Sequence, residues 1–501
     1  MVRYREAADG DTKELSWGSD HVTQLFGDFR RPGEISKLRG FATAHRRPWF
    51  RDIWAVQAVT LAREITLLFE AGGRTEGIDW PEFVAASEAI VCLGLKPPQH
   101  SDPVSNTHAS SFSPISLINR TREDRLHGLL WKERPLAILS RLAGVFDVAD
   151  PRDKIFGLSN LVRGGIAVND AFRADYTKDV TQIYCEVSKA IIRESASLSI
   201  LSIPRRSRGT GVDGLPSWVP DWTRNRRTAQ LGSTRYGEID DQTFNATRGS
   251  QTQVEIDEVT SSLRVWAHLV DRISAVGTIL REDEVPRTCF RDHSNNKEKD
   301  KDNESFFNIP KCSYVFDDWT RVAGLPNQTV PYITGGSAWD AFAQTLVCGK
   351  ASHVSGAALW AQLRVLEKYA AIARFVSSVP IDSDTPNHRQ DLVDRGVSYM
   401  RAALFYDDDT RGNLDPGYEA HLAPLGDRRV FRTTRGYIGL GPALADVGDE
   451  VVLVKGASVP LVLRPRGGGA AARTLRGDCF IYGAMGGEAW NERDVIPIWI
   501  T

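Results

Sequence analysis

The stretch that organises this chain is Asp150-Pro151-Arg152-Asp153-Lys154-Ile155-Phe156-Gly157-Leu158. Its first residues are typical of a helix start. Asp150 can accept backbone N–H groups, and Pro151 suits the first helical position, where its missing N–H costs nothing. Asp153 adds negative charge near the positive end of the helix. The stretch therefore predicts a capped helix whose apolar face begins at Ile155.

Residues 150–161, DPRDKIFGLSNL, resemble a signature segment of fungal heterokaryon incompatibility (HET) proteins. Three further segments resemble the same family and follow its order along the chain. They are Arg47-Pro48-Trp49-Phe50-Arg51-Asp52-Ile53-Trp54-Ala55-Val56-Gln57, Leu215-Pro216-Ser217-Trp218-Val219-Pro220-Asp221-Trp222 and Arg429-Val430-Phe431-Arg432-Thr433-Thr434-Arg435-Gly436-Tyr437-Ile438-Gly439-Leu440-Gly441-Pro442. Each match alone is weak, but four in order are specific.

These motifs supply the candidate site residues, each with a structural or family-motif role. They are Trp49, Phe50, Trp54, Gln57, Asp150, Pro151, Arg152, Asp153, Trp218, Asp221, Trp222, Arg435, Gly436 and Gly439. We assign no residue as catalytic, cofactor-binding or metal-ligating, and we predict no cofactor.

Structural roles compete with functional ones at these positions. Asp150, Arg152 and Asp153 could form an acid–base cluster, but helix capping with a local ion pair is the favoured interpretation. Trp218 and Trp222 are large enough to anchor their loop onto a helical core, and a ligand-stacking platform is the alternative.

The glycines of the last motif, Gly436, Gly439 and Gly441, have a GxxGxG spacing. A dinucleotide-binding loop needs a strand, then the glycines, then a helix. Here Pro442 and another strand-like run follow, so turn or bulge glycines are favoured.

Bulk properties exclude several classes of function. The chain has 501 residues, 42% of them hydrophobic and 25% charged, which fits two or three globular domains. The net charge of −2 gives no electrostatic case for nucleic acid. The sequence has no apolar run of about 18 residues for a membrane span and no secretory signal. The six cysteines form no CxxC pair, so we expect reduced thiols and a cytoplasmic location.

The predicted fold class is α+β, with a mainly helical N-terminal and central region and a C-terminal antiparallel β-barrel-like domain. The expected parts are a flexible leader over 1–46, the end of a HET domain over 47–95, a helical region over 117–250, a mixed region over 251–426 with a charged disordered insert over 291–305, and a small β domain over 427–501.

Helical periodicity predicts helices over 48–69, 80–93, 135–146, 339–348, 356–376 and 391–405, and one that Thr177 caps. A strand-like piece over 65–69 overlaps the end of the first helix. The apolar face of that helix is expected to be buried and to contain Trp54, Ala58, Leu61, Ile65 and Leu68. Alternation predicts strands within 253–278 and from Asp427 onward, with the run Val451 to Val454 in a central strand.

The resemblance also bears on catalysis. HET domains resemble TIR domains, some of which cleave NAD, and that chemistry would need the upstream part of the domain and the glutamate that usually follows the motif glutamine. Here Ala58 follows Gln57, and only 48 residues precede Trp49. We therefore expect most of the HET domain to be absent, unless the true start codon lies upstream, and we predict that the chain is not an enzyme.

Two functions remain. In the first, the resemblance implies an intracellular factor of non-self recognition or programmed cell death, with a protein partner. In the second, the chain is an enzyme or accessory protein of a fungal specialised-metabolite pathway, with a pocket between the helical region and the β domain. Arg432, Arg435 and Tyr437 could bind an anion or a protein partner, although a solvated edge of the β domain explains them equally well.

Overall fold

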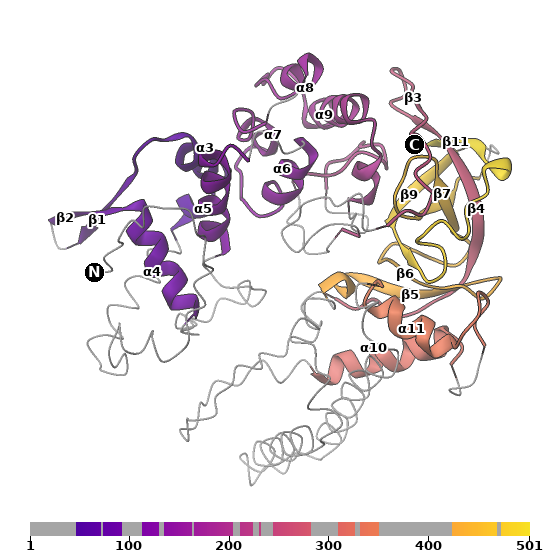
Figure 1. Ribbon diagram of the computed structural model, residues 1–501. Helices are drawn as coiled ribbons and strands as arrows, with labels where there is room; N and C mark the ends of the chain where they lie inside the picture. The colour runs from indigo at the N-terminus through magenta and orange to yellow at the C-terminus, as the bar shows by residue number, and fades with distance from the viewer. Residues whose placement is uncertain are drawn as a thin grey trace, which may run out of the picture. The chain divides into compact units, whose positions relative to one another are not determined.

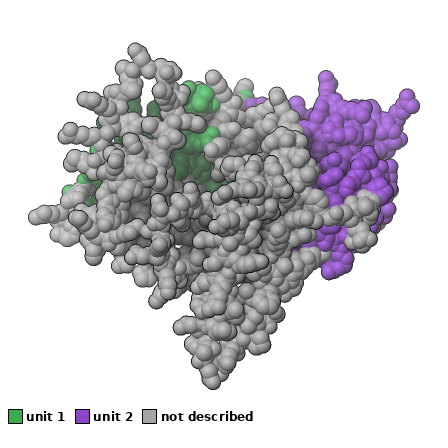
Figure 2. All heavy atoms as spheres, turned by 60° about the horizontal axis from the view of Figure 1, so that its bottom comes forward, with its two compact units in different colours: residues 1–179 green, residues 180–501 purple. Residues whose placement is uncertain are grey.

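The computed structural model describes residues 47–71, 74–92, 113–129, 135–162, 165–203, 211–223, 230–231, 244–281, 309–325, 331–349, 423–467 and 472–501. The chain divides into two compact units, residues 1–179 and 180–501, which are treated separately below (Figure 1, Figure 2). The features predicted over 1–46, 291–305, 356–376 and 391–405 lie outside the described residues.

The first unit is mainly helical. Its described elements are a short 3-10 helix (Pro48–Arg51), α3 (Ile53–Leu61), a hairpin of β1 (Thr66–Ala71) and β2 (Arg74–Asp79), α4 (Trp80–Cys92), α5 (Ser113–Leu126), α6 (Pro135–Leu142), α7 (Asp153–Phe156) and α8 (Ile166–Ala171). Helices α4 and α6 confirm the predictions over 80–93 and 135–146.

Helix α3 is much shorter than the helix predicted over 48–69. It starts where the Asp52 carboxylate accepts the N–H of Trp54 at 2.9 Å. Residues 66–71 pair with 74–79 as a hairpin, so the strand-like signal overrides the helical period there. The predicted buried face is also wrong, because Trp54, Ala58 and Leu68 are exposed. The side chains of α3 that are buried are Ile53, Ala55, Val56, Val59 and Thr60.

An arginine of α5 satisfies the backbone at the end of α3. Nη1 of Arg122 donates to the carbonyl oxygens of Val59 (2.7 Å) and Ala62 (2.6 Å), and Nη2 donates to that of Arg63 (2.8 Å). Carbonyls in the last turn of a helix lack intrahelical partners, so this side chain replaces a backbone cap. Burial lowers the pKa of Arg122.

The second unit contains helices and a large sheet. Its described helices are α9 (Val180–Ser195), α10 (Ile309–Val322), α11 (Ala338–Leu346) and the short 3-10 helices Ser199–Ser202, Ala423–Leu425 and Glu492–Asp494. Helix α9 buries an apolar face that includes Ile183, Tyr184, Val187 and Ile191, and α11 confirms the helix over 339–348. The cap prediction is wrong, because Thr177 donates its backbone N–H and its hydroxyl to Asp175 and α9 begins three residues later.

The sheet contains nine described strands: β3 (Val254–Ile256), β4 (Leu263–Val276), β5 (Arg428–Thr433), β6 (Ile438–Pro442), β7 (Glu450–Val454), β8 (Leu461–Pro465), β9 (Ala472–Asp478), β10 (Phe480–Ile481) and β11 (Ile496–Ile500). Their hydrogen-bonded order is β10-β6-β5-β4-β11-β9-β8-β7, with β3 paired to β4. The strands predicted within 253–278 and from Asp427 onward are confirmed.

Strand β4 is the centre of this sheet. It pairs with β3, β5, β7 and β11, and register shifts near Asp271 and Ser274 allow one strand to serve several neighbours. Since β7 pairs with both β8 and β4, the path β4-β11-β9-β8-β7 returns to β4. The sheet thus extends beyond the predicted 427–501 segment. It is not wholly antiparallel either, because β9 and β11 are parallel.

The core of the second unit lies between the sheet and its helices. Helix α10 packs against β5 and α11 against β6, as Figure 1 shows. All five residues of β7 are buried, and it pairs on both sides, which confirms a central strand. The mixed α+β class is therefore confirmed. None of the described helices has the length and hydropathy that a membrane span requires.

Candidate functional site

The family stretch at 150–158 folds as a turn that leads into the four-residue helix α7. The Asp150 carboxylate accepts the backbone N–H of Arg152 at 3.0 Å, and the Asp150 carbonyl accepts that of Asp153 at 3.0 Å. Asp150 therefore closes a turn, but the predicted helix cap is wrong, because α7 starts at Asp153 rather than at Pro151 and no side chain caps it. Hydrogen bonds from the Arg152 side chain are the main reason that the pKa of Asp150 is lowered.

Arg152 ties this turn to a second segment of the first unit. Its Nε and Nη2 donate to the Asp150 carboxylate at 3.0 and 2.6 Å, while Nη1 donates to the carbonyl oxygens of Tyr176 (2.8 Å) and Lys178 (3.2 Å). The guanidinium carbon lies 5.0 Å from the centre of the Tyr176 ring, within the range of a cation–π contact. One side chain thus holds residues 150 and 176–178 together.

Asp153 joins three segments that are distant in sequence. Its Oδ1 accepts the hydroxyl of Tyr176 at 2.6 Å, and its Oδ2 accepts the indole N–H of Trp54 at 3.2 Å. The bond to this carboxylate is the main reason that the pKa of Tyr176 is raised to about 12, because the carboxylate favours the neutral phenol. The motifs at 47–57 and 150–158 therefore meet at Asp153.

The rest of the stretch anchors this cluster. Lys154 is buried, and its Nζ donates to the carbonyl oxygens of Ala143 (2.7 Å) and Phe146 (2.5 Å) just after α6. A Cβ atom added to Gly157 would lie 2.6 Å from the side chain of Ile53, so only glycine allows this approach to α3. Our candidate residues omitted Lys154 and Gly157, although both are part of the quoted motif.

Three aromatic side chains of the first unit are partly open to solvent, and two of them, Trp54 and Tyr176, bond to Asp153. Trp49 is 43% exposed, Trp54 40% and Tyr176 50%. Phe50, by contrast, is buried and stacks on Phe83 with ring centres 5.3 Å apart. We name Trp54 and Tyr176, which both bond to Asp153, the aromatic surface. Tyr176 was missed as a candidate because nothing in its own segment distinguishes it from a surface tyrosine.

The carboxylates of this cluster are already engaged. Asp150 and Asp153 accept hydrogen bonds from the side chains of Arg152, Trp54 and Tyr176, and the ion pair between Asp150 and Arg152 is the one that we predicted. Of the described residues, no group of three His, Cys, Asp or Glu side chains is placed to hold a metal ion. Gln57, on the same helix as Trp54, has a buried Oε1 without a hydrogen-bond donor among the described residues.

The candidates at 218–222 lie in the second unit. Trp218 and Trp222 are fully buried, and the indole N–H of Trp218 donates to the carbonyl of Ser261 at 2.8 Å. Asp221 accepts the backbone N–H and the hydroxyl of Thr223 at 3.0 and 2.5 Å, which closes a turn. Burial favours the anchoring role of both tryptophans over a ligand-stacking platform.

The last motif forms the β5–β6 hairpin. The N–H of Arg435 donates to the buried carboxylate of Asp271 at 2.7 Å. Gly436 has a φ of +100°, which suits a turn, and a Cβ on Gly439 would lie 2.3 Å from the ring of Phe431. These contacts explain the glycines as turn and close-approach residues.

Comparison with known proteins bears on the identity of these motifs. A family model described as the Het-6 beta-barrel domain matches residues 363–495, which include strands β5 to β10. The heterokaryon incompatibility protein 6, OR allele, of Neurospora crassa is 25% identical over 519 aligned positions, covering 95% of this chain and 69% of that protein. No solved structure matches the chain. The resemblance to heterokaryon incompatibility proteins is thus confirmed.

Proposed function

We propose that this chain, a relative of heterokaryon incompatibility proteins, is a cytoplasmic recognition factor that binds a protein partner and promotes cell death between unlike fungal cells. The observation that carries the proposal is the double hydrogen bond of Asp153, which holds Trp54 and Tyr176 in place while leaving both rings partly exposed. Family motifs are thus used to present a surface.

The aromatic surface has the composition of a binding hot spot. Tryptophan, tyrosine and arginine are enriched among the residues that dominate the energy of protein–protein interfaces. Because Asp153 and Arg152 already restrain these side chains, less conformational entropy is lost when a partner binds. A rigid aromatic surface therefore supports recognition of a protein.

The test is a cell-fusion assay. A strain that expresses the chain is fused with a strain of different incompatibility type, and dead fusion cells are counted with a vital dye. Trp54→Ala should reduce killing, since loss of a hot-spot residue weakens binding by about 2 kcal/mol, or roughly thirtyfold. Leu126→Ala is the matched control, because Leu126 is an exposed apolar residue of the same unit.

Killing by Trp54→Ala at the wild-type level would show that this surface is not the recognition site. The absence of catalysis is tested separately by incubating the purified chain with NAD and measuring nicotinamide release. Clear turnover would contradict a purely recognising role.

A second function, as an enzyme or accessory protein of a specialised-metabolite pathway, is favoured by one observation. The second unit contains a pocket lined partly by arginine side chains. A pocket of this kind suits a small ligand better than a protein surface.

A further inference from the structure

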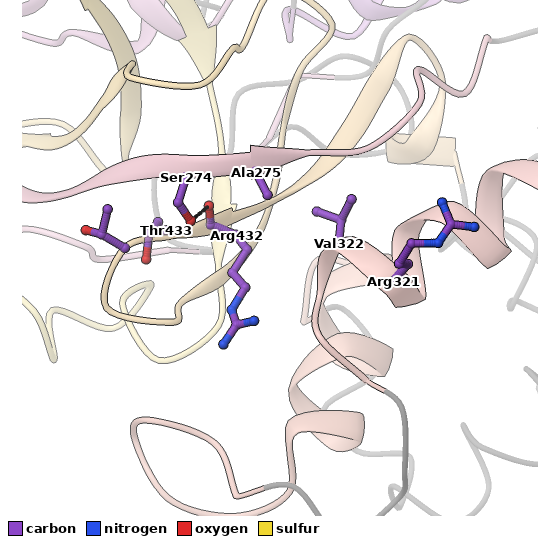
Figure 3. A pocket seen from close by; sticks show the side chains of 7 residues that line it. Ser274, Ala275, Arg321, Val322, Arg432 and Thr433 are labelled. Carbon is purple, nitrogen blue, oxygen red and sulfur yellow. Dashed lines mark hydrogen bonds between the residues drawn. The ribbon is translucent and has the colours of Figure 1, made fainter.

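The pocket lies where strands β4 and β5 face helix α10 (Figure 3). Its volume is about 560 Å³, and Ser274, Arg321, Arg432 and Thr434 of its lining are exposed, so it is an open depression on the surface of the second unit. The lining residues are Ser274, Ala275, Arg321, Val322, Arg432, Thr433 and Thr434. The pocket belongs to the second unit, so an inference about it is independent of the aromatic surface in the first unit.

The charge of the lining is positive. Two of the described lining residues are arginines, and none is acidic. Arg321 pairs with Asp318 at 3.0 Å, whereas Arg432 has no carboxylate within ion-pair distance among the residues that the structure describes. Asp318 also accepts the N–H and the hydroxyl of Thr278, at 2.6 and 2.9 Å. The guanidinium of Arg432 therefore keeps its donors available for a ligand.

One glycine leaves room for this guanidinium. A Cβ atom on Gly324, whose φ is +73°, would lie 2.4 Å from Nη1 of Arg432. The hydroxyl of Ser274 donates to the backbone carbonyl of Arg432 at 3.1 Å and fixes its strand (Figure 3). The backbone of Arg432 is thus held against β4, while its side chain is exposed to solvent.

Polar groups beside Arg432 already form hydrogen bonds within the protein. The hydroxyl of Thr434 donates to Asp271, and the hydroxyl of Thr433 accepts the N–H of Tyr437 at 3.0 Å. Arg435 donates its backbone N–H to Asp271, and its guanidinium lies over the Tyr437 ring at 5.7 Å. Of the three residues that the sequence suggested for anion binding, only Arg432 therefore lines the pocket.

We propose that this pocket binds the oxyanion group, phosphate or carboxylate, of a small organic ligand. The planar fork of a guanidinium matches both groups and forms charge-assisted hydrogen bonds with them. The side chains of Ala275 and Val322 provide apolar contacts for the rest of the ligand. Arg321 already forms an ion pair with Asp318, so it contributes less than Arg432 to binding of the oxyanion.

The test measures binding of inorganic phosphate and of acetate by calorimetry, at constant ionic strength so that general screening does not change. The wild-type chain should bind at least one probe, and Arg432→Gln should weaken that binding by about tenfold or more. Arg466→Gln is the matched control, because Arg466 is an exposed arginine of the same sheet that lies outside the pocket.

Binding of phosphate alone identifies a phosphorylated ligand, and binding of acetate alone identifies a carboxylate. Gly324→Ala should weaken binding as Arg432→Gln does, since it displaces the guanidinium without removing it. Equal affinity of Arg432→Gln and wild type would overturn the proposal. The absence of binding of either probe by wild type up to about 50 mM would also overturn it.

Discussion

Replacing Asp478 with alanine should strongly destabilise the second unit, because Arg428 then loses the carboxylate that it faces. Both side chains are 1% exposed, and their charged atoms lie 2.6 Å apart. The same carboxylate accepts the backbone N–H of Leu231 at 2.9 Å. Removing one member of a buried ion pair costs about 3–5 kcal/mol, and an orphaned amide adds about 1 kcal/mol. We therefore expect a loss of about 4–6 kcal/mol in the free energy of unfolding.

The matched control is the ion pair between Arg264 and Glu255 of the same sheet. Its charged atoms lie 2.9 Å apart, but Glu255 is 56% exposed. Exposed pairs contribute about 0–1 kcal/mol, because water solvates the remaining charge. Glu255→Ala should therefore cost less than about 1 kcal/mol. Since the two distances are similar, the difference between the variants measures the effect of burial.

Hydrogen exchange followed by mass spectrometry is the appropriate assay. The exchange rate of the β7 peptide, Glu450–Val454, gives the free energy of opening for the centre of the sheet. A double variant, Arg428→Met with Asp478→Leu, should recover part of the loss, because apolar groups often replace a buried ion pair at little cost. Equal exchange rates of the β7 peptide in Asp478→Ala and Glu255→Ala would refute this reasoning.

Three further predictions follow from contacts in the two units. Gly439→Ala should lower the free energy of unfolding by about 1–3 kcal/mol through overpacking, and so lower the urea midpoint of unfolding. Gly467→Ala should leave the midpoint unchanged, since nothing lies within 4 Å of its added Cβ. Ultraviolet titration should show a pKa of about 12 for Tyr176 and a lower pKa in Asp153→Asn. Because the pKa of this phenol is higher in the folded chain than in the unfolded chain, its hydrogen bond to Asp153 stabilises the fold fully below pH about 10. That stabilisation is lost as the pH rises toward about 12. Arg122→Ala should destabilise the first unit by about 1–3 kcal/mol, because carbonyl oxygens at the end of α3 lose their donor; a thermal-melting midpoint equal to wild type would contradict this.

Some local interactions could be predicted from the sequence alone. The turn at Asp150 reaches only two residues along the chain, and turn glycines such as Gly436 act through their own φ angle. A helix after Thr177 and a central strand over Val451 to Val454 were predicted because each has a strong hydrophobic pattern, and α9 and β7 lie there. Interactions within a few residues depend on neighbours that the sequence displays directly.

Other features were decided only by the tertiary structure. Periodicity placed Ala58 on a buried face, but α3 buries the face of Ile53, Val56, Val59 and Thr60 instead, so Ala58 is exposed. The contact between Trp54 and Asp153 spans 99 positions, and the ion pair of Arg428 spans 50. Such contacts form only after distant segments are brought together, and their gain must exceed the entropy of closing the loop between them. The sequence therefore determined the local elements and the family motifs, while the fold decided which side chains meet.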